Sequence, residues 1–326
     1  MSLTLVPYTD DQAGAWDAFV RDSRNGTLFH TQRLLGYHPQ GRFEDHSLLF
    51  RDGSAIRAVL PGAFRREEGK VRFISHPGST LGGMVLAPRE GVATTMACLD
   101  LLLEHLRSEG VSAATFFRLT SSLARRAPSD DQEYALLQHG FRLFRYELGS
   151  MISLDGVGEE DLLGLFDVQC RNQVRQAERA GVVVRQSEDF EAYWPILEQT
   201  LDARHGVHPT HTIPEMRRIV ERCPGEIRFY GAELQGRLIA GLMTMSLTER
   251  CEYVKYMAQD YSHQKARPMN LLIVATLKDC LRRGVGVLDL GVSMDVSGEK
   301  IHPGLFAFKE GFGAHGVRRE SFTIDL

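Results

Sequence analysis

Gln235-Gly-Arg-Leu-Ile-Ala-Gly-Leu-Met243 reads as a turn followed by an apolar strand, and Asp52-Gly-Ser-Ala-Ile-Arg-Ala-Val-Leu60 repeats this pattern in the first half of the chain. Farther along, Leu106-Arg-Ser-Glu-Gly-Val111 and Leu281-Arg-Arg-Gly-Val285 match with one residue deleted, and each joins a long helix to a buried strand. The order of the two units is the same in both halves. We therefore interpret the chain as two repeats of one architecture, with the coincidence of two common units as the alternative.

Regular elements are expected around these stretches. Apolar periodicity, turn residues and helix caps predict their bounds. In the first half we expect two short helices, strands over 46–51, 55–64, 71–75 and 83–86, a helix over 92–109, a strand over 113–119, a helix over 132–139 and a strand over 141–152. In the second half we expect helices over 161–180 and 190–205 around a strand over 182–186, a loop through 214, a meander over 227–234, 237–248 and 252–259, a helix over 268–283, a strand over 287–290, a helix near 305–312 and a strand over 317–324.

The composition is that of a folded protein with room for two cores. The chain has 326 residues, of which 43% are hydrophobic and 25% charged. Its five cysteines form no C-x-x-C pair, which fits a reducing, cytoplasmic location, and no apolar run approaches the roughly 20 residues that span a bilayer. A net charge of -4 argues against DNA as a broad, sequence-independent partner.

The order of hairpin, helix, strand, helix and last strand resembles the Gcn5-related N-acetyltransferase (GNAT) fold, and two such halves resemble the Fem peptidyltransferases. Arg171-Asn-Gln-Val-Arg-Gln-Ala-Glu-Arg-Ala-Gly181 is similar to the basic helix of that family, and Phe306-Ala-Phe-Lys-Glu-Gly-Phe-Gly313 to its Phe-Lys segment. The resemblance implies an α+β fold of two tandem GNAT-like domains, each a mixed, mostly antiparallel sheet flanked by helices. We expect residues 1–150 to be scaffold and acceptor platform and residues 151–326 to hold the donor, with the last strand a candidate to return to the first domain.

The resemblance also implies an activity. It is the transfer of an acyl or aminoacyl group to an amine of a small molecule or peptide, with a peptidoglycan precursor as one acceptor and no tightly bound cofactor. The co-substrate is either acyl-CoA or aminoacyl-tRNA. In place of the glycine-rich phosphate cradle of acetyltransferases the chain has Gln264-Lys-Ala-Arg-Pro-Met269, which disfavours CoA bound in the usual manner. Residues 151–326 contain 21 Lys and Arg against 25 Asp and Glu, which disfavours charged tRNA as a partner.

Two other functions stay open at this point. One is a non-catalytic binding module built on degenerate GNAT halves, and the other is an acetyl-CoA-dependent N-acetyltransferase for a small metabolite. Neither a Gly-x-Ser-x-Gly elbow nor a Cys/His pair stands out as a nucleophile, so direct attack by the amine is the simpler chemistry.

The candidates for catalysis are a lysine, a tyrosine and one of two aspartates. The Phe-Lys resemblance implies that Lys309 handles the donor near the reacting carbonyl. Tyr256 lies on the strand that borders the expected reaction centre, where it could bind the acceptor or relay a proton, or simply fill the core. Asp295, like Asp289, could act as a base. Strict alternation along this strand places Tyr253, Lys255 and Met257 on one face and Val254, Tyr256 and Ala258 on the other.

The candidates for substrate binding are mostly basic or aromatic. In the loop after the helix ending near 205, the resemblance implies that Arg204 clamps an acidic group of the acceptor, with His208 in place of a family tyrosine and His211 beside it. The H-x-x-H-x-x-H spacing lacks a clear fourth ligand, so we predict no metal site. The remaining candidates are the Phe-Lys phenylalanine, two arginines on one helix face and two cations before a helix N-terminus, namely Phe308, Arg171, Arg175, Lys265 and Arg267.

Overall fold

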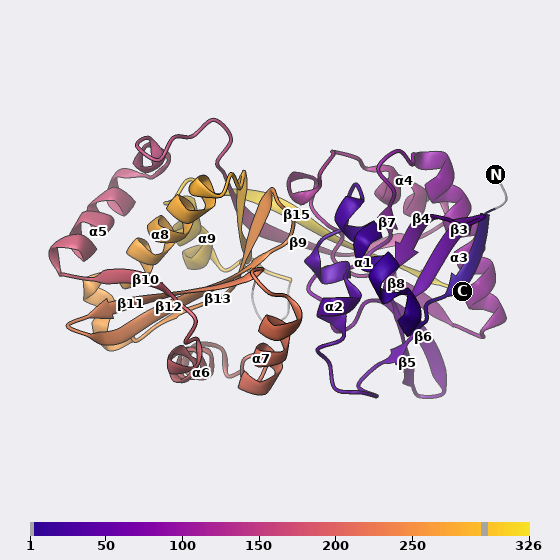
Figure 1. Ribbon diagram of the computed structural model, residues 1–326, viewed down its shortest axis with the longest axis horizontal. Helices are drawn as coiled ribbons and strands as arrows, with labels where there is room; N and C mark the ends of the chain where they lie inside the picture. Colours follow the sequence, from indigo (N-terminus) through magenta and orange to yellow (C-terminus); the bar gives the residue numbers. More distant parts are fainter. Residues whose placement is uncertain (1–2, 295–298) are drawn as a thin grey trace. The chain divides into compact units, whose positions relative to one another are not determined.

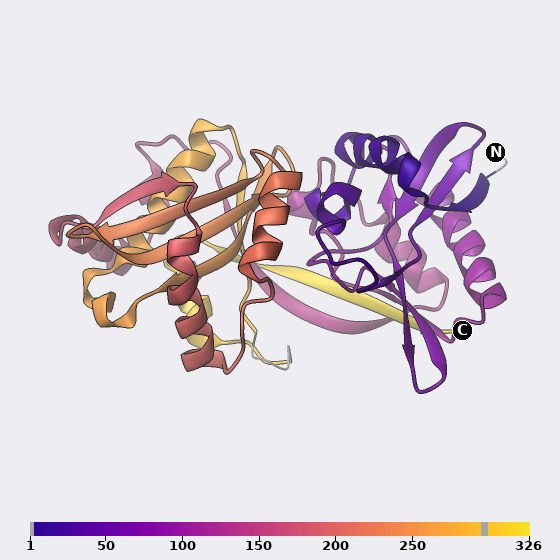
Figure 2. The same ribbon diagram turned by 60° about the horizontal axis from the view of Figure 1, so that its bottom comes forward.

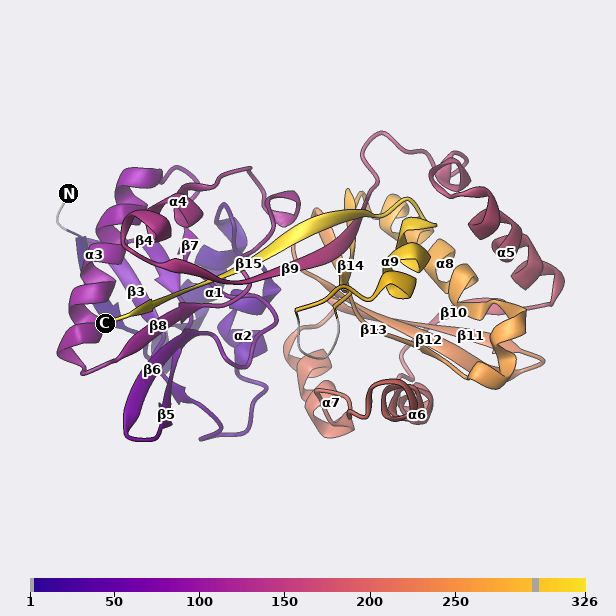
Figure 3. The same cartoon turned by 180° about the vertical axis from the view of Figure 1, so that it is seen from behind.

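The computed structural model describes residues 3–294 and 299–326, and within the helix that ends at His205 the side chains of residues 204 and 205 are not described. The chain divides into two compact units, Met1–Glu147 with Arg318–Leu326, and Leu148–Val317. Strand β9 (Arg142–Ser153) carries the chain from the first unit to the second, and β15 (His315–Asp325) carries it back; both are labelled in Figures 1 and 3. Among the described residues, none of the helices has the length and apolar composition needed to cross a membrane.

In the described part of the first unit, the chain forms two sheets and four α-helices. One sheet has the order β1-β3-β4-β7, and the other continues from β15 in the order β15-β8-β6-β5-β2. The apolar face of α3 and the inward residues of both sheets form one core. The elements are β1 (Leu3–Pro7), α1 (Ala13–Asp22), α2 (Gln32–Leu35), β2 (Glu44–Asp45), β3 (Leu48–Asp52), β4 (Ala55–Leu60), β5 (Ala63–Glu67), β6 (Lys70–Ser75), β7 (Val85–Leu86), α3 (Val92–Ser108), β8 (Ala113–Phe116) and α4 (Asp131–Gln138).

The second unit is a sheet with helices on both faces. Its strand order is β10-β11-β12-β13-β14-β9, antiparallel except where β13 meets β14. Helices α5, α8 and α9 lie on one face and α6 and α7 on the other (Figures 1, 2 and 3). The elements are α5 (Val168–Arg179), β10 (Val183–Ser187), α6 (Trp194–His205), α7 (Ile213–Arg222), β11 (Ile227–Leu234), β12 (Arg237–Ser246), β13 (Cys251–Gln259), α8 (Pro268–Arg282), β14 (Val287–Val292) and α9 (Pro303–Glu310).

The ends of α3 and α8 share one local geometry. After α3, Val111 N donates to Leu106 O at 3.0 Å around Gly110, whose φ is +69°. After α8, Val285 N donates to Cys280 O at 2.9 Å around Gly284, whose φ is +73°. Glycine suits both turns because it reaches the left-handed region without a Cβ clash. The same sequence signal therefore ends the same helix-to-strand unit in both halves.

One expected strand of the first unit is wrong. The run 55–64 is two strands: β4 pairs with β3 and β7, whereas β5 pairs with β6 and β2 in the other sheet. The chain changes sheet at Pro61 and Gly62. Pro61 has no N–H to give to a ladder, and a Cβ on Gly62 would collide with the ring of Phe73.

In the second unit, one helix prediction needs correction and one helix was missed. The helix expected over 161–180 is a short 3-10 turn (Leu162–Leu165) followed by α5, because the side chain of Asp167 accepts a hydrogen bond from Cys170 N at 2.6 Å and begins a new helix there. Helix α7 was not predicted at all. Its N-terminus is a capping box, in which Thr212 and Glu215 each bind the other's backbone N–H, with Pro214 in the first turn.

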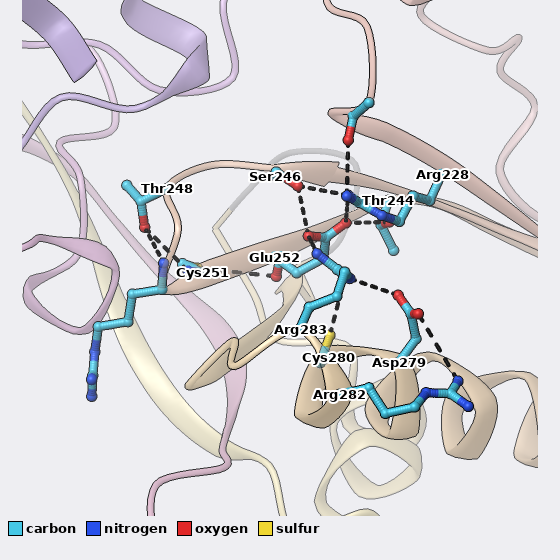
Figure 4. A network of polar contacts seen from close by, with 12 residues as sticks. Arg228, Thr244, Ser246, Thr248, Cys251, Glu252, Asp279, Cys280, Arg282 and Arg283 are labelled. Atoms are coloured by element: carbon cyan, nitrogen blue, oxygen red, sulfur yellow. Dashed lines mark hydrogen bonds and ion pairs between the residues drawn. The ribbon is translucent and has the colours of Figure 1, made fainter.

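A buried network of charges fastens the C-terminal end of α8 to the meander (Figure 4). Glu252 on β13 is 1% exposed, and its carboxylate accepts hydrogen bonds from Thr244 Oγ1 at 2.5 Å and Ser246 Oγ at 2.9 Å. Two guanidinium groups, those of Arg228 and Arg283, pair with the same carboxylate. Charges buried in this way are stable only when paired and hydrogen-bonded, so the network fixes the beginning of β13.

Candidate functional site

Strands β13 and β14 diverge in the middle of the second unit. In the described part of the chain they pair in parallel from Cys251–Tyr253 to Val287–Asp289, after which β13 continues alone to Gln259 on that side. Beyond Tyr253 this edge of β13 has backbone N–H and C=O groups that no strand among the described residues covers. The last residues of β13, from Met257 to Gln259, border a pocket.

The pocket has a volume of about 580 Å³ and lies wholly within the second unit. Its walls come from the end of β13, the starts of α5 and α8, one turn of α6, and α9. The wall is apolar on the side of α9, through Leu305, Phe308 and Phe312, and Met257 and Met269 extend this surface. The polar lining residues include Asp167, Gln173, Thr200, Gln264, Arg267, Asn270 and His302.

The N-terminus of α8 borders the pocket. Arg267 precedes the helix in the left-handed conformation, with φ +55°, and Pro268 occupies the first helical turn. Both Arg267 and Asn270 line the pocket, and the buried Nε of Arg267 has no hydrogen-bond partner among the described residues. The positive end of a 15-residue helix beside a guanidinium group favours an anionic group of a ligand.

A thiol also lines the pocket. Asn270 Nδ2 donates to Cys170 Sγ at 3.7 Å and to Gln173 Oε1 at 3.1 Å, which joins α8 to α5. Burial raises the pKa of the Cys170 thiol to about 12. A thiol with that pKa is protonated at neutral pH and is a poor nucleophile. This lining therefore suits a direct transfer better than a covalent cysteine intermediate.

The predicted alternation along β13 fails at Lys255. Met243 pairs with Tyr256 but Thr244 pairs with Val254, so Lys255 is an extra residue in a β-bulge. As a result Val254 and Met257 both pack into the core under α8, whereas Tyr256 lies on the face covered by α6. Strict alternation predicts instead that Val254 shares a face with Tyr256 and that Met257 lies on the opposite face.

Tyr256 and His211, two predicted site residues, lie together in the interior. The Tyr256 hydroxyl is 2.6 Å from His211 Nδ1 and accepts from His211 N at 3.3 Å. The edge of Trp194 packs against the Tyr256 ring with centroids 5.8 Å apart, and Lys255 Nζ lies 5.6 Å from the ring centroid. Both residues are buried, and neither is among the residues that line the pocket.

Lys309 is buried beside the pocket rather than exposed in it. It is 1% exposed, and its Nζ donates to Gly291 O at 3.1 Å and Val292 O at 3.2 Å, so it holds the end of β14. Burial lowers the pKa of Lys309 to about 8, with Asp289 acting in the opposite direction. Phe308 precedes it on α9 and does line the pocket. Phe308 therefore lines the pocket, whereas Lys309 is buried and binds the backbone at the end of β14.

The other candidates are placed as follows. Arg171 donates to the carbonyls of Leu163 and Phe166, which fastens the turn before α5. Arg175 is exposed and lies 3.5 Å from Asn172 Oδ1. Lys265 and His208 have exposed side chains, and neither lines the pocket. The side chain of Arg204 and the whole of Asp295 lie outside the described residues.

The structure thus brings Arg267 and Phe308 into one pocket, together with residues that the sequence did not single out. Asp167, Gln173 and Asn270 are the polar members that were missed. Asp167 carried a readable signal, because an Asp before an amphipathic run is a typical N-cap. Gln173 and Asn270 carried none, since their pairing depends on the packing of α5 against α8.

Comparisons with known proteins agree with this geometry. Residues 168–309 match the family model described as an acetyltransferase (GNAT) domain. A sequence search of curated proteins found no match. Among solved structures, FemX has a TM-score of 0.75 at 14% identity over 99% of this chain and 97% of its own. These similarities confirm the predicted fold class of two tandem GNAT-like domains and, at the level of the fold, the resemblance to Fem proteins.

Two further structures are similar over nearly the whole chain. The C-terminal domain (DUF2156) of a putative lysylphosphatidylglycerol synthetase from Agrobacterium fabrum has a TM-score of 0.62 at 13% identity, covering 96% of this chain and 91% of its own. A tandem GNAT protein from the clavulanic acid biosynthesis pathway has a TM-score of 0.54 at 15% identity, covering 99% and 98%. At these identities the likeness concerns the fold.

Proposed function

We propose that this chain, which shares its tandem GNAT fold with FemX, is an acyltransferase. It moves an acyl or aminoacyl group from an activated donor to an amine. The pocket of the second unit holds the donor. The observation that carries this proposal is the open edge of β13 ending beside the N-terminus of α8 and Arg267.

The two parts of the pocket suit two parts of an acyl-CoA. An extended chain that contains amides can pair with the uncovered backbone groups of β13, as an added strand would. Phosphate oxygens then meet the N–H groups at the start of α8 and the guanidinium of Arg267. Acyl-CoA has both features in one molecule. We therefore place it ahead of aminoacyl-tRNA as the donor.

The transfer needs no covalent enzyme intermediate. The acceptor amine attacks the donor carbonyl, the new C–N bond forms, and the bond from the carbonyl carbon to the leaving sulfur or oxygen breaks. The proton lost by the amine ends on the leaving group. Backbone N–H groups on the open edge of β13 are oriented donors that can stabilise the oxyanion. Lys309 acts in this scheme as a positioning residue, because it binds the backbone of Gly291 and Val292.

The acceptor is an amine of a small molecule or peptide. The Fem resemblance points to an amine of a peptidoglycan precursor as the specific acceptor. Aminoacyl-tRNA is the second candidate donor, because the fold similarity to FemX extends over the whole chain and the segment before α8 lacks the glycines of a usual phosphate cradle.

Donor binding tests the proposal directly. Thermal shift with acetyl-CoA and filter retention of a charged tRNA pool would be measured for the wild type, Arg267→Gln and the matched control Lys265→Gln. We expect acetyl-CoA to stabilise the wild type and the control, and its Kd to rise about tenfold in Arg267→Gln, since one charge-assisted hydrogen-bond partner is lost.

The alternative results are equally definite. Retention of charged tRNA without any response to acetyl-CoA would make the chain an aminoacyl transferase. Binding of either donor without product over a panel of amines would instead make it a binding module. An equal Kd in Arg267→Gln and Lys265→Gln would remove the start of α8 from the donor site.

A further inference from the structure

The first unit has a pocket of its own, with a volume of about 590 Å³. It lies beside α2 and the segment that leads into β2, and all of its lining residues belong to the first unit. The donor site proposed above does not use it. Its lining combines rings, carboxylates and buried polar groups.

Two buried side chains in this pocket, Gln32 and His76, can donate hydrogen bonds to a ligand. Gln32 is 8% exposed, and its Nε2 has no hydrogen-bond partner among the described residues. His76 is 3% exposed, and its Nδ1 accepts a hydrogen bond from Gly78 N at 3.1 Å, so the ring proton is on Nε2. That Nε2 lies 3.9 Å from Asp45 Oδ2, beyond hydrogen-bond distance. The buried Nε2 of Gln32 lacks an acceptor in the described part of the chain, which is costly, so a ligand oxygen at this point would relieve that cost. The Nε2–H of His76, which also lines the pocket, is a second donor for the same oxygen.

The charge of the lining is negative. Asp10 and Asp45 line the pocket with exposed side chains, and no Lys or Arg is among the described residues that line it. Burial raises the pKa of Tyr8 to about 12. The nearby carboxylates of Asp10 and Asp45 act in the same direction and are the next largest causes. Burial also keeps His76 neutral by lowering its pKa to about 3. An anionic ligand is therefore disfavoured and a cation is favoured.

Aromatic rings complete the site. Phe43 packs edge-on against His76 with ring centroids 5.3 Å apart and against His38 at 4.8 Å. Tyr8 adds a fourth ring to the lining. Of these rings, Phe43 and Tyr8 are of the kind that attracts an ammonium group through a ring face, and all four can pack against its carbon chain.

We propose that this pocket binds the ammonium group of an organic amine that has a carbonyl oxygen near its nitrogen, as in an amino acid amide or a peptide N-terminus. The ammonium lies toward Asp10 and Asp45, and the carbonyl oxygen accepts from Gln32 and His76. The site stands independently of the transfer reaction proposed above, because it requires neither donor nor product.

The test is titration calorimetry of the full chain, without any acyl donor, using L-lysinamide as the probe. Its Nα,Nε-diacetyl derivative keeps the carbonyl groups and removes both charges. We expect saturable binding of L-lysinamide and no measurable binding of the diacetyl compound. Asp10→Asn/Asp45→Asn should raise the Kd about tenfold, and Gln32→Leu about fivefold, for loss of ion-pair and hydrogen-bond partners.

Glu44→Gln is the matched control. Glu44 neighbours Asp45, but its carboxylate pairs with Arg66 at 2.6 Å and does not line the pocket, so this variant should bind as the wild type does. Equal binding of the two probes by the wild type would overturn the proposal without any variant. An unchanged Kd in the double variant, or no saturable binding of L-lysinamide, would overturn it too. Because no donor is present, failure here and failure of the transferase proposal are separate results.

Discussion

The hydroxyl of Tyr256 lies 2.6 Å from Nδ1 of His211, inside the second unit and away from the residues that line its pocket. We therefore expect this pair to support the bulge of β13 rather than to act on a substrate. Tyr256→Phe removes a buried hydrogen-bond partner of His211 and should lower the free energy of unfolding by about 1–2 kcal/mol. Urea unfolding measures this change.

The control for this variant is Tyr134→Phe, since Tyr134 is 55% exposed in the first unit and its change should be near zero. The kcat/KM for transfer should stay close to that of the wild type in Tyr256→Phe. A large fall in kcat with unchanged stability would return Tyr256 to the catalytic role that the sequence suggested.

Lys309 predicts a pH dependence of stability. Burial lowers its folded-state pKa to about 8, against 10.5 for an ordinary lysine. Between these values the unfolded chain binds more protons than the folded chain, so the free energy of unfolding rises with pH through this range. Relative to Lys309→Met, the wild type should gain roughly 3 kcal/mol between pH 7 and pH 11.

Urea unfolding at several pH values, with Lys265→Met as an exposed control, measures this gain. The control should follow the wild type at every pH. A difference between the wild type and Lys309→Met that stays constant with pH would show that Lys309 has an ordinary pKa in the folded chain.

Glu252 should matter for stability and not for donor binding. Glu252→Ala leaves the guanidinium groups of Arg228 and Arg283 without their shared carboxylate, a change that costs about 3–5 kcal/mol in buried pairs. The matched control is Glu159→Ala, which breaks an exposed pair with Lys278 and should cost less than about 1 kcal/mol. At a temperature where Glu252→Ala stays folded, its acetyl-CoA Kd should equal that of the wild type.

Local signals explain which parts of the fold were predictable. The turns at Asp52-Gly53 and Gln235-Gly236, and the glycines after α3 and α8, act within a few residues, and the structure has these elements where they were expected. The division of 55–64 into two strands was not predicted, because it depends on Phe73 occupying the space beside Gly62. Helix α7 is a different case, since the Thr212 and Glu215 capping box was readable in the sequence.

The site shows the same division between local and distant causes. Arg267 and Lys265 are two residues apart in one short segment, and both were candidates for a phosphate. Arg267, which has the left-handed conformation, lines the pocket, whereas Lys265 does not. The bulge at Lys255 depends on pairing with β12, so alternation along β13 alone wrongly grouped Tyr256 with Val254 on one face. The residue types therefore indicated which side chains could belong to the site, but packing between elements distant in sequence decides where those side chains point.

Cys170 provides the test of direct transfer. Its pKa of about 12 leaves about one thiol in 10⁴ ionised at pH 8, so alkylation by iodoacetamide in the folded chain should be far slower than that of a free cysteine. Cys170→Ala should retain transfer activity, because no bond to sulfur is made in the proposed reaction. Val174→Ala, one turn along α5 and buried in the same core, controls for the loss of packing. Loss of transfer in Cys170→Ala but not in Val174→Ala, with an acyl group trapped on the wild-type chain, would replace direct attack with a two-step mechanism through this thiol.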